Sequence, residues 1–136
     1  MSKLVELQTG DRLEQITLSP VSRMDLIKYA GSSLDFNPIH TVDEEAAKAG
    51  LPGIIAHGMW TMGNLAKIFT PYYEEGFIQD YQIRFAGMVF LNDTVTLKAE
   101  VTDRTNDNLL FDVKAVNQHD KSVIKGSIKF KLLKDE

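Results

Sequence analysis

The feature that most constrains the fold is a series of four segments in the last third of the chain in which apolar and polar residues alternate. They cover residues 79–90, 93–104, 108–118 and 122–133. A period of two predicts β-strands that have one covered and one solvated face. In the last segment Ile124, Ile128 and Phe130 fall on one face, and Lys125 and Lys129 fall on the other. The predicted sheet therefore needs an apolar layer against one face only.

The connections between these segments are short and polar. They are residues 91–93, 105–107 and 119–121. Such sequences favour tight turns, so the simplest topology is an antiparallel meander in which each strand pairs with the next. The open edges of a sheet are commonly hidden by joining two copies across a two-fold axis. We therefore expect a homodimer or a higher homo-oligomer, and a heterodimer with a related chain is also compatible.

Residues 55–69 are the best candidate for the layer that covers the sheet. Wound as a helix, this segment is apolar on nearly every side. A helix of that kind is expected to be buried. Its small residues, such as Ala56, Gly58 and Gly63, allow close approach to a sheet, although a glycine inside a helix costs about 1 kcal/mol relative to alanine.

Two shorter helices are expected before the central one. Ser22 and Asp25 have the spacing of a capping box, which predicts a helix over residues 22–31. Asp43 can cap a second helix that Gly50 ends. Together these elements predict an α+β fold in one domain covering residues 1–136, with a curved antiparallel sheet wrapped around one central helix.

Composition excludes several classes of function. The net charge is −4 and neither sign forms a long block, so nucleic acid is not an expected partner. The chain has no cysteine, which excludes disulfides, thiolate metal sites and a thiol nucleophile. No apolar run approaches the roughly 20 residues that span a bilayer, and the first residues are charged rather than leader-like. We expect a cytoplasmic protein without a membrane segment.

The residues with chemical potential are concentrated in one stretch around Asp35 and His40. Proline at position 38 disfavours helical backbone at Asn37, so Asp35 and His40 lie on a turned loop that can bring their side chains together. A carboxylate and an imidazole at this spacing fit an acid–base pair. They also fit a turn in which Asp35 bonds its own backbone and His40 is structural. The spacing alone does not choose between these interpretations.

Three further interpretations of polar residues remain open. Asp35, His40 and His57 resemble a facial metal set of two histidines and one carboxylate, although no further ligand-rich cluster supports a metal. Ser33 beside the loop favours capping or turn formation over nucleophilic catalysis, because no strand–turn–helix elbow with flanking glycines surrounds it. His119 falls in a predicted turn, where a solvated histidine is expected.

The run YAGSSLDFNPIHTVDEEAAKAG, followed by PGIIAHGM, closely resembles the signature of the MaoC-like family of (R)-specific enoyl-thioester hydratases and 3-hydroxyacyl-thioester dehydratases. That signature has an aspartate, any residue, Asn-Pro, an aliphatic residue and a histidine. An alanine-rich helix and a later His-Gly-Met follow. The similarity continues weakly through residues 83–85 and 92–94. It thus covers nearly the whole chain, with one strongly specific motif.

This resemblance implies a hot-dog fold and a lyase that reversibly hydrates trans-2-enoyl thioesters in fatty-acid metabolism. The motif assigns the catalytic pair to Asp35 and His40 and the oxyanion donor to the backbone amide of Gly58. Asn37 and His57 are the further positions expected at the substrate, and neither a metal nor an organic cofactor is implied. The substrate would be an acyl thioester of coenzyme A or of acyl carrier protein.

The sequence departs from the family pattern at four positions. Leu34 stands where many members have glycine, Met88 and Asn92 replace a proline and a glycine, and Ala66 replaces a hydroxyl residue. Asn92 can still adopt left-handed turn geometry. Two other functions are compatible with the same fold: a non-catalytic acyl-thioester-binding subunit of a heterodimer, and an acyl thioesterase. The Asp-Asn-Pro-His pattern argues against both.

Overall fold

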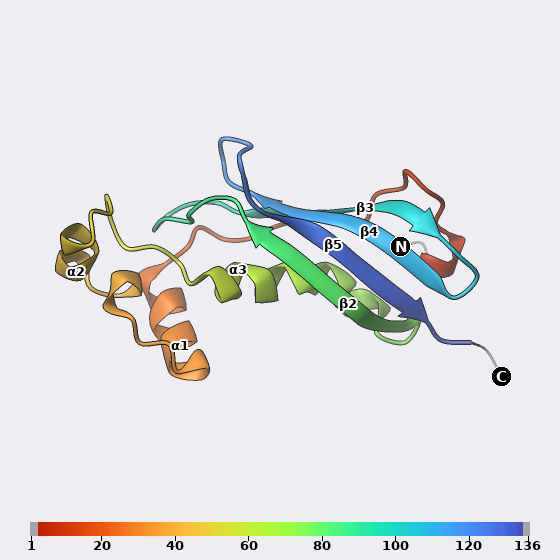
Figure 1. Cartoon of the computed structure of the whole chain (residues 1–136), viewed down its shortest axis with the longest axis horizontal. Coiled ribbons are helices and arrows are strands. Elements are labelled where there is room, and N and C mark those ends of the chain that lie inside the picture. Colours follow the sequence, from red (N-terminus) through yellow and green to blue (C-terminus); the bar gives the residue numbers. More distant parts are fainter. Residues whose placement is uncertain (1–2, 135–136) are drawn as a thin grey trace.

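The computed structural model describes residues 3–134, and its elements form an antiparallel sheet above one helix, with further helices to one side (Figure 1). The helices, 3-10 turns included, are η1 Leu4–Glu6, α1 Arg23–Ser33, η2 Pro38–His40, α2 Asp43–Lys48, α3 Gly58–Leu65 and η3 Ala66–Tyr72. The strands are β1 Ile16–Thr17, β2 Gly76–Phe85, β3 Thr96–Arg104, β4 Asn108–Val116 and β5 Ser122–Leu132.

The sheet has the strand order β1-β3-β4-β5-β2, and every neighbouring pair is antiparallel. The predicted hairpins at residues 105–107 and 119–121 are confirmed. The predicted turn at residues 91–93 is wrong, because β2 pairs with β5 rather than with β3. Residues 86–95 instead cross from one edge of the sheet to the other side of β4 and β5. The short strand β1, which has no alternating pattern of its own, was not predicted.

One face of the sheet supplies most of the core. In β3 the alternation is confirmed, since Val95, Leu97, Ala99 and Val101 are all at most 4% exposed. In β5 the lysines point away from the buried Phe130 and its apolar neighbours, as expected. The sheet extends over α3 as an open layer and is not curled around the helix (Figure 1).

The central helix differs from its prediction in length and in burial. It begins at Gly58 and gives way to η3 after Leu65, so residues 55–57 form extended backbone with a bridge from Ile55 to Phe90. Thr61 and Leu65 are buried beneath the sheet, but Met59 is 56% exposed. The expectation of burial on every side is therefore wrong for the single chain. Apolar composition identified the helix but could not tell which of its sides the sheet leaves exposed.

Helix α1 begins as predicted. The Ser22 hydroxyl accepts a hydrogen bond from the Asp25 amide, and the Asp25 carboxylate accepts one from the Ser22 amide, both at 3.0 Å. Asp43 does not cap α2; it is the first residue of that helix and makes no capping bond. Its carboxylate instead accepts two hydrogen bonds from Arg23, which ties α2 to α1. Gly50 follows α2 with a φ of 82°, as a helix-ending glycine should.

The crossover after β2 is fastened by a buried carboxylate. Asp93 is 8% exposed and accepts hydrogen bonds from the Phe90 amide and from the Gln118 side chain, both at 2.8 Å. Asn92 beside it has the left-handed φ of 69° that the sequence analysis allowed for. Residues 87–89 of the crossover line the same cavity as Gly58 at the start of α3. Within residues 3–134, no helix combines the length and the apolar character needed to cross a membrane.

Candidate active site

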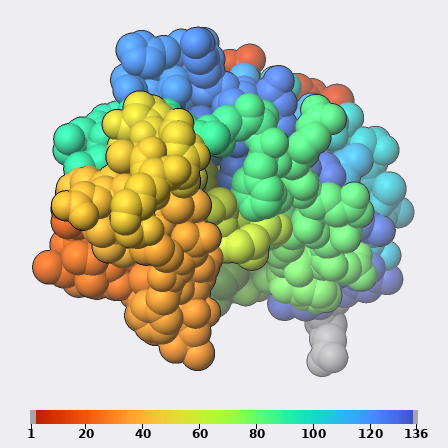
Figure 2. All heavy atoms as spheres, turned by 60° about the vertical axis from the view of Figure 1, so that its left-hand side comes forward, coloured from red at the N-terminus to blue at the C-terminus, as the bar shows by residue number. Residues whose placement is uncertain are grey.

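The first turn of α3 lies at the bottom of a hollow. Figure 2 shows it as yellow-green atoms between the orange and yellow helical segment and the green strand that follows. The corresponding cavity has a volume of about 530 Å³, within the range of small-molecule sites. Polar groups come from Asp35 and His57, and apolar walls come from Phe85, Met88 and Ile124. Residues from the loop after α1, from the central helix and from the sheet therefore meet in one place.

The loop that carries Asp35 is shaped by hydrogen bonds of neighbouring side chains. Helix α1 ends at Ser33, and the C-cap residue Leu34 has a left-handed φ of 63°, a conformation that glycine adopts without strain. The Ser33 hydroxyl accepts from the Asp35 amide at 3.2 Å, which confirms a turn-forming role for this serine. The Asp35 carboxylate in turn accepts from the Asn37 amide at 3.2 Å, so the predicted Asx turn is present. Turn formation and a place at the cavity turn out to be compatible roles for Asp35.

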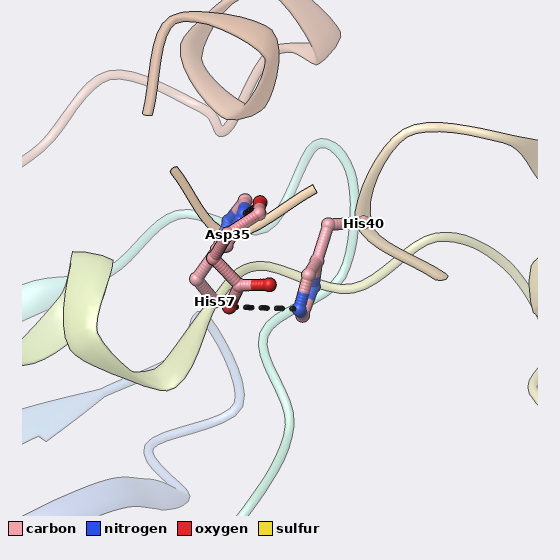
Figure 3. A group of neighbouring side chains, drawn as sticks. All are labelled: Asp35, His40 and His57. Atoms are coloured by element: carbon pink, nitrogen blue, oxygen red, sulfur yellow. Dashed lines mark hydrogen bonds and ion pairs between the residues drawn. The ribbon is translucent and has the colours of Figure 1, made fainter. Parts of the chain in front are cut away.

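His40 is buried, and its hydrogen bonding fixes which nitrogen is free on the side of Asp35. Nδ1 lies 2.7 Å from the backbone carbonyl oxygen of Ile55. Because a carbonyl oxygen only accepts, Nδ1 must carry the proton, which leaves the lone pair of neutral His40 on Nε2. Nε2 lies 3.9 Å from Asp35 Oδ2 (Figure 3), too far for a direct hydrogen bond but close enough for both atoms to contact one water oxygen.

His57 lies behind this pair. Its ring stacks on the ring of His40 with centroids 3.8 Å apart and planes inclined by 22°. Its Nε2 lies 3.1 Å from the backbone carbonyl oxygen of Asp35. The Tyr29 ring packs against it with ring centroids 4.8 Å apart. His57 is 2% exposed, and within residues 3–134 its Nδ1 has no hydrogen-bond partner. This residue therefore contacts both members of the predicted catalytic pair.

Gly58 opens α3, so its amide belongs to the first turn, where backbone N–H groups have no partner within the helix. The residue is exposed at the cavity, and the Phe85 ring lies against it. A β-carbon added at position 58 would stand 2.6 Å from Phe85 Cε1. Any other residue at this position would therefore have to displace the Phe85 ring.

The proximity of Asp35, His40 and His57 requires a test of the metal interpretation. One candidate ligand atom from each lies within 4.8 Å of the others. A metal ion bonds imidazole nitrogen at about 2.0 to 2.1 Å and in the plane of the ring. The rings of His40 and His57 are stacked and nearly parallel, so their in-plane lone pairs do not converge on one point. The trio as arranged does not fit a shared ion.

The structure brings all the predicted site residues into one region. Asp35, His40, His57 and Gly58 contact one another or line one cavity, and Asn37 shapes the turn between the first two through a bond from the Ile39 amide to its side chain. Tyr29 and Phe85 were not among the predicted site residues. Tyr29 lies one helical turn before Ser33 at the end of α1, and this spacing could have predicted that its ring lies on the same side of the helix as the loop that carries Asp35. Phe85 is the last residue of β2, and its place at the site follows from the unpredicted pairing of β2 with β5.

Comparison with known proteins identifies a family and a shared fold over nearly the full chain. The model of the MaoC like domain matches residues 6–123. The R-hydratase PhaJ1 from Pseudomonas aeruginosa, in its unliganded form, superposes with a TM-score of 0.86 at 25% identity, covering 96% of this chain and 84% of that one.

Two curated relatives extend the comparison. The mitochondrial 3-hydroxyacyl-[acyl-carrier-protein] dehydratase of Arabidopsis thaliana is 25% identical over 122 residues, which are 87% of this chain and 72% of that protein. The fatty acid synthase subunit beta of Aspergillus oryzae is 30% identical over 107 residues, 76% of this chain. The chain spans only 5% of that subunit's length, so the match concerns one region of a much larger protein.

Proposed function

The chain belongs to the MaoC-like family of hydratases and dehydratases in fatty-acid metabolism, and on that premise we propose that it reversibly hydrates trans-2-enoyl thioesters to (R)-3-hydroxyacyl thioesters. It has the hot-dog fold of its structural relatives. The observation that carries the proposal is the 3.9 Å separation of Asp35 Oδ2 and His40 Nε2 beside the open amide of Gly58. Two acceptors and one donor are the groups that this reaction needs.

In the hydration direction, Asp35 and His40 would hold one water by its two hydrogens. Its oxygen attacks carbon 3 of the enoyl group while His40 Nε2 accepts one of its protons. The electron pair of the double bond moves through carbon 2 onto the thioester oxygen. His40 then returns the proton to carbon 2, so that water has been added and the imidazole is neutral again. Dehydration runs through the same steps in reverse, with Asp35 holding the departing hydroxyl.

The negative charge on the thioester oxygen needs a donor that is already in place. The Gly58 amide would supply it, aided by the positive end of the α3 dipole. Mutational data on comparable sites put one such donor at about 10²- to 10³-fold in rate. The exposed face of Gly58 supports this assignment, since a thioester can approach the backbone there without meeting a side chain of position 58.

The test is hydration of crotonyl-CoA by the purified protein, followed by loss of the enoyl-thioester absorbance. Asp35→Asn and His40→Gln should each lower kcat by roughly 10²- to 10⁴-fold, the usual contribution of a positioned acid–base group. His119→Gln is the matched control, because His119 is exposed in the β4–β5 turn. Circular dichroism establishes that the variants are folded. Near-normal hydration by either Asp35→Asn or His40→Gln would overturn the assignment.

The same assay separates the other functions that the fold supports. A free-thiol reagent detects thioesterase activity, and binding of the enoyl thioester without turnover would favour an acyl-binding subunit of a heterodimer. Crotonyl thioesters of coenzyme A and of acyl carrier protein, compared at equal concentration, identify the preferred carrier. We also propose that the active form is a dimer, since Met59, Phe77 and Phe85 are each at least 50% exposed along α3 and the edge strand β2.

A further inference from the structure

We infer that His57 is a positioning residue that fixes the Asp35 backbone and the His40 ring relative to each other, and that it does so as a neutral imidazole protonated on Nε2. This inference rests on the proposed function and deepens it, because it assigns a role to the third polar residue of the site. It differs from a direct contact between His57 and the substrate, which was the expectation from the sequence.

The first support is the pair of contacts that His57 makes. Its Nε2 reaches the carbonyl oxygen of Asp35 at 3.1 Å, and its ring covers the ring of His40 at 3.8 Å. Asp35 and His40 belong to the loop after α1, whereas His57 is the residue immediately before α3. A single side chain thus joins the acid–base loop to the helix that carries Gly58. Without it, the Asp35 backbone would lose this bond to the segment before α3, and His40 would keep only its own bond to the Ile55 carbonyl oxygen.

The second support is the hydrogen bonding of the His57 ring. The partner of Nε2 is a carbonyl oxygen, which can only accept, so Nε2 must be the protonated nitrogen. The other nitrogen, Nδ1, has an accessible area below 1 Å² and no partner within residues 3–134. A proton there would place a buried N–H without an acceptor, which is costly. The ring is therefore held in one neutral tautomer.

The third support is the complementarity of the two histidines. His40 carries its proton on Nδ1, against the Ile55 carbonyl, and His57 carries its proton on Nε2, against the Asp35 carbonyl. Each ring is oriented by a backbone acceptor from the other segment, since Ile55 precedes α3 and Asp35 follows α1. Two neutral rings can stack in this way, whereas two positively charged rings at 3.8 Å would repel each other.

Two substitutions separate the two contacts. His57→Gln keeps an amide donor for the Asp35 carbonyl but removes the ring. His57→Phe keeps an aromatic ring against His40 and Tyr29 but removes the donor. Because misplacement of a catalytic group by about 1 Å can cost 10²-fold in rate, we expect His57→Phe to lower kcat by roughly 10- to 100-fold with KM within about 3-fold of wild type. His57→Gln should recover part of the lost kcat.

A double-mutant cycle with Asp35→Asn distinguishes positioning from an independent effect. If His57 acts through Asp35, His57→Phe should reduce the residual hydration rate of Asp35→Asn by less than about 3-fold, because the group to be positioned has already been removed. Equal fold-losses in both backgrounds would overturn the inference. A raised KM at unchanged kcat would overturn it as well, because that result indicates a substrate contact.

A spectroscopic measurement tests the same inference without reference to turnover. The chain has three histidines, and the exposed His119 serves as the internal reference. Long-range ¹H–¹⁵N correlation spectra of the imidazoles should show His57 protonated on Nε2 and His40 on Nδ1, each as a single tautomer. A His57 proton on Nδ1, or tautomer exchange like that of a solvated ring, would refute it. If the wild type hydrated no enoyl thioester, the proposed function would fail while these spectra still decided the role of His57.

Discussion

Replacing Gly58 with alanine should abolish most of the activity while leaving the fold nearly intact. The added β-carbon would lie 2.6 Å from Cε1 and 2.9 Å from Cζ of the Phe85 ring, where ordinary contact begins at 3.4 Å. The ring must therefore retreat by about 0.8 Å. Phe85 is 54% exposed, so it can turn toward solvent at a cost below the roughly 1 to 3 kcal/mol of overpacking in a closed core.

The helix itself gains from the same change. Alanine is favoured over glycine inside a helix by about 1 kcal/mol, although less in the first turn, which offsets part of the displacement of the ring. The free energy of unfolding should thus stay within about 1 kcal/mol of wild type in urea titrations. The methyl group, however, occupies the approach to the Gly58 amide, and loss of one oxyanion donor costs about 10²- to 10³-fold in kcat.

A second variant shows whether displacement of Phe85 is responsible instead. Phe85→Ala removes the clash, so the double variant with Gly58→Ala should be well packed and still inactive if the methyl group itself blocks the amide. Recovery of hydration in the double variant would instead assign the loss to the displaced ring. Wild-type-like kcat for Gly58→Ala alone would refute the oxyanion role of this amide.

Three further changes test the scaffold. Tyr81→Phe removes a 2.5 Å hydrogen bond from the phenol to the Met62 carbonyl and should cost about 1 kcal/mol of unfolding free energy in urea. Burial raises the pKa of Tyr81 to about 12 from 10.0, so the wild type should lose stability as pH rises from 10 toward 12, and Tyr81→Phe should lack that loss. Asp93→Ala should cost about 2 to 3 kcal/mol in the same titration, because it strips the Gln118 side chain and a backbone amide of their shared acceptor. Leu34→Gly should raise thermal stability by up to about 1 kcal/mol, since it relieves a left-handed φ of 63° at a side chain that is 75% exposed; a lower melting temperature would contradict this.

The sequence predicts local parts of the fold well and non-local pairings poorly. The β3–β4–β5 meander follows from alternation and from tight turns, and both signals lie within neighbouring residues. The pairing of β2 with β5 depends on which edge the crossover reaches, and that path is fastened by the buried Asp93 and its bond to Gln118. Neither residue looks different in sequence from an ordinary turn residue. The two-residue strand β1 is too short to show any period.

The candidate site was proposed from the sequence on a different kind of signal. The motif named Asp35, His40 and Gly58, but nothing in the residue pattern gives the tautomer of a histidine or the stacking of two rings. Those depend on where the carbonyl oxygens of Ile55 and Asp35 point after folding. Leu34 shows the opposite case: its difference from the family pattern was visible in the sequence, but the left-handed backbone that would favour glycine at this position is visible only in the structure.

The pairing of β2 with β5 also determines the order in which the molecule can assemble. On a nascent chain, β2 emerges long before its strand partner β5, because residues 86–121, with the whole of β3 and β4, are made in between. Until β5 arrives, the apolar side chains of β2 and the open backbone of that strand have nothing to pair with. Closure of such a distant contact is slow relative to the hairpins. Synthesis of this protein should therefore pass through an intermediate in which β2 is the segment most in need of a chaperone.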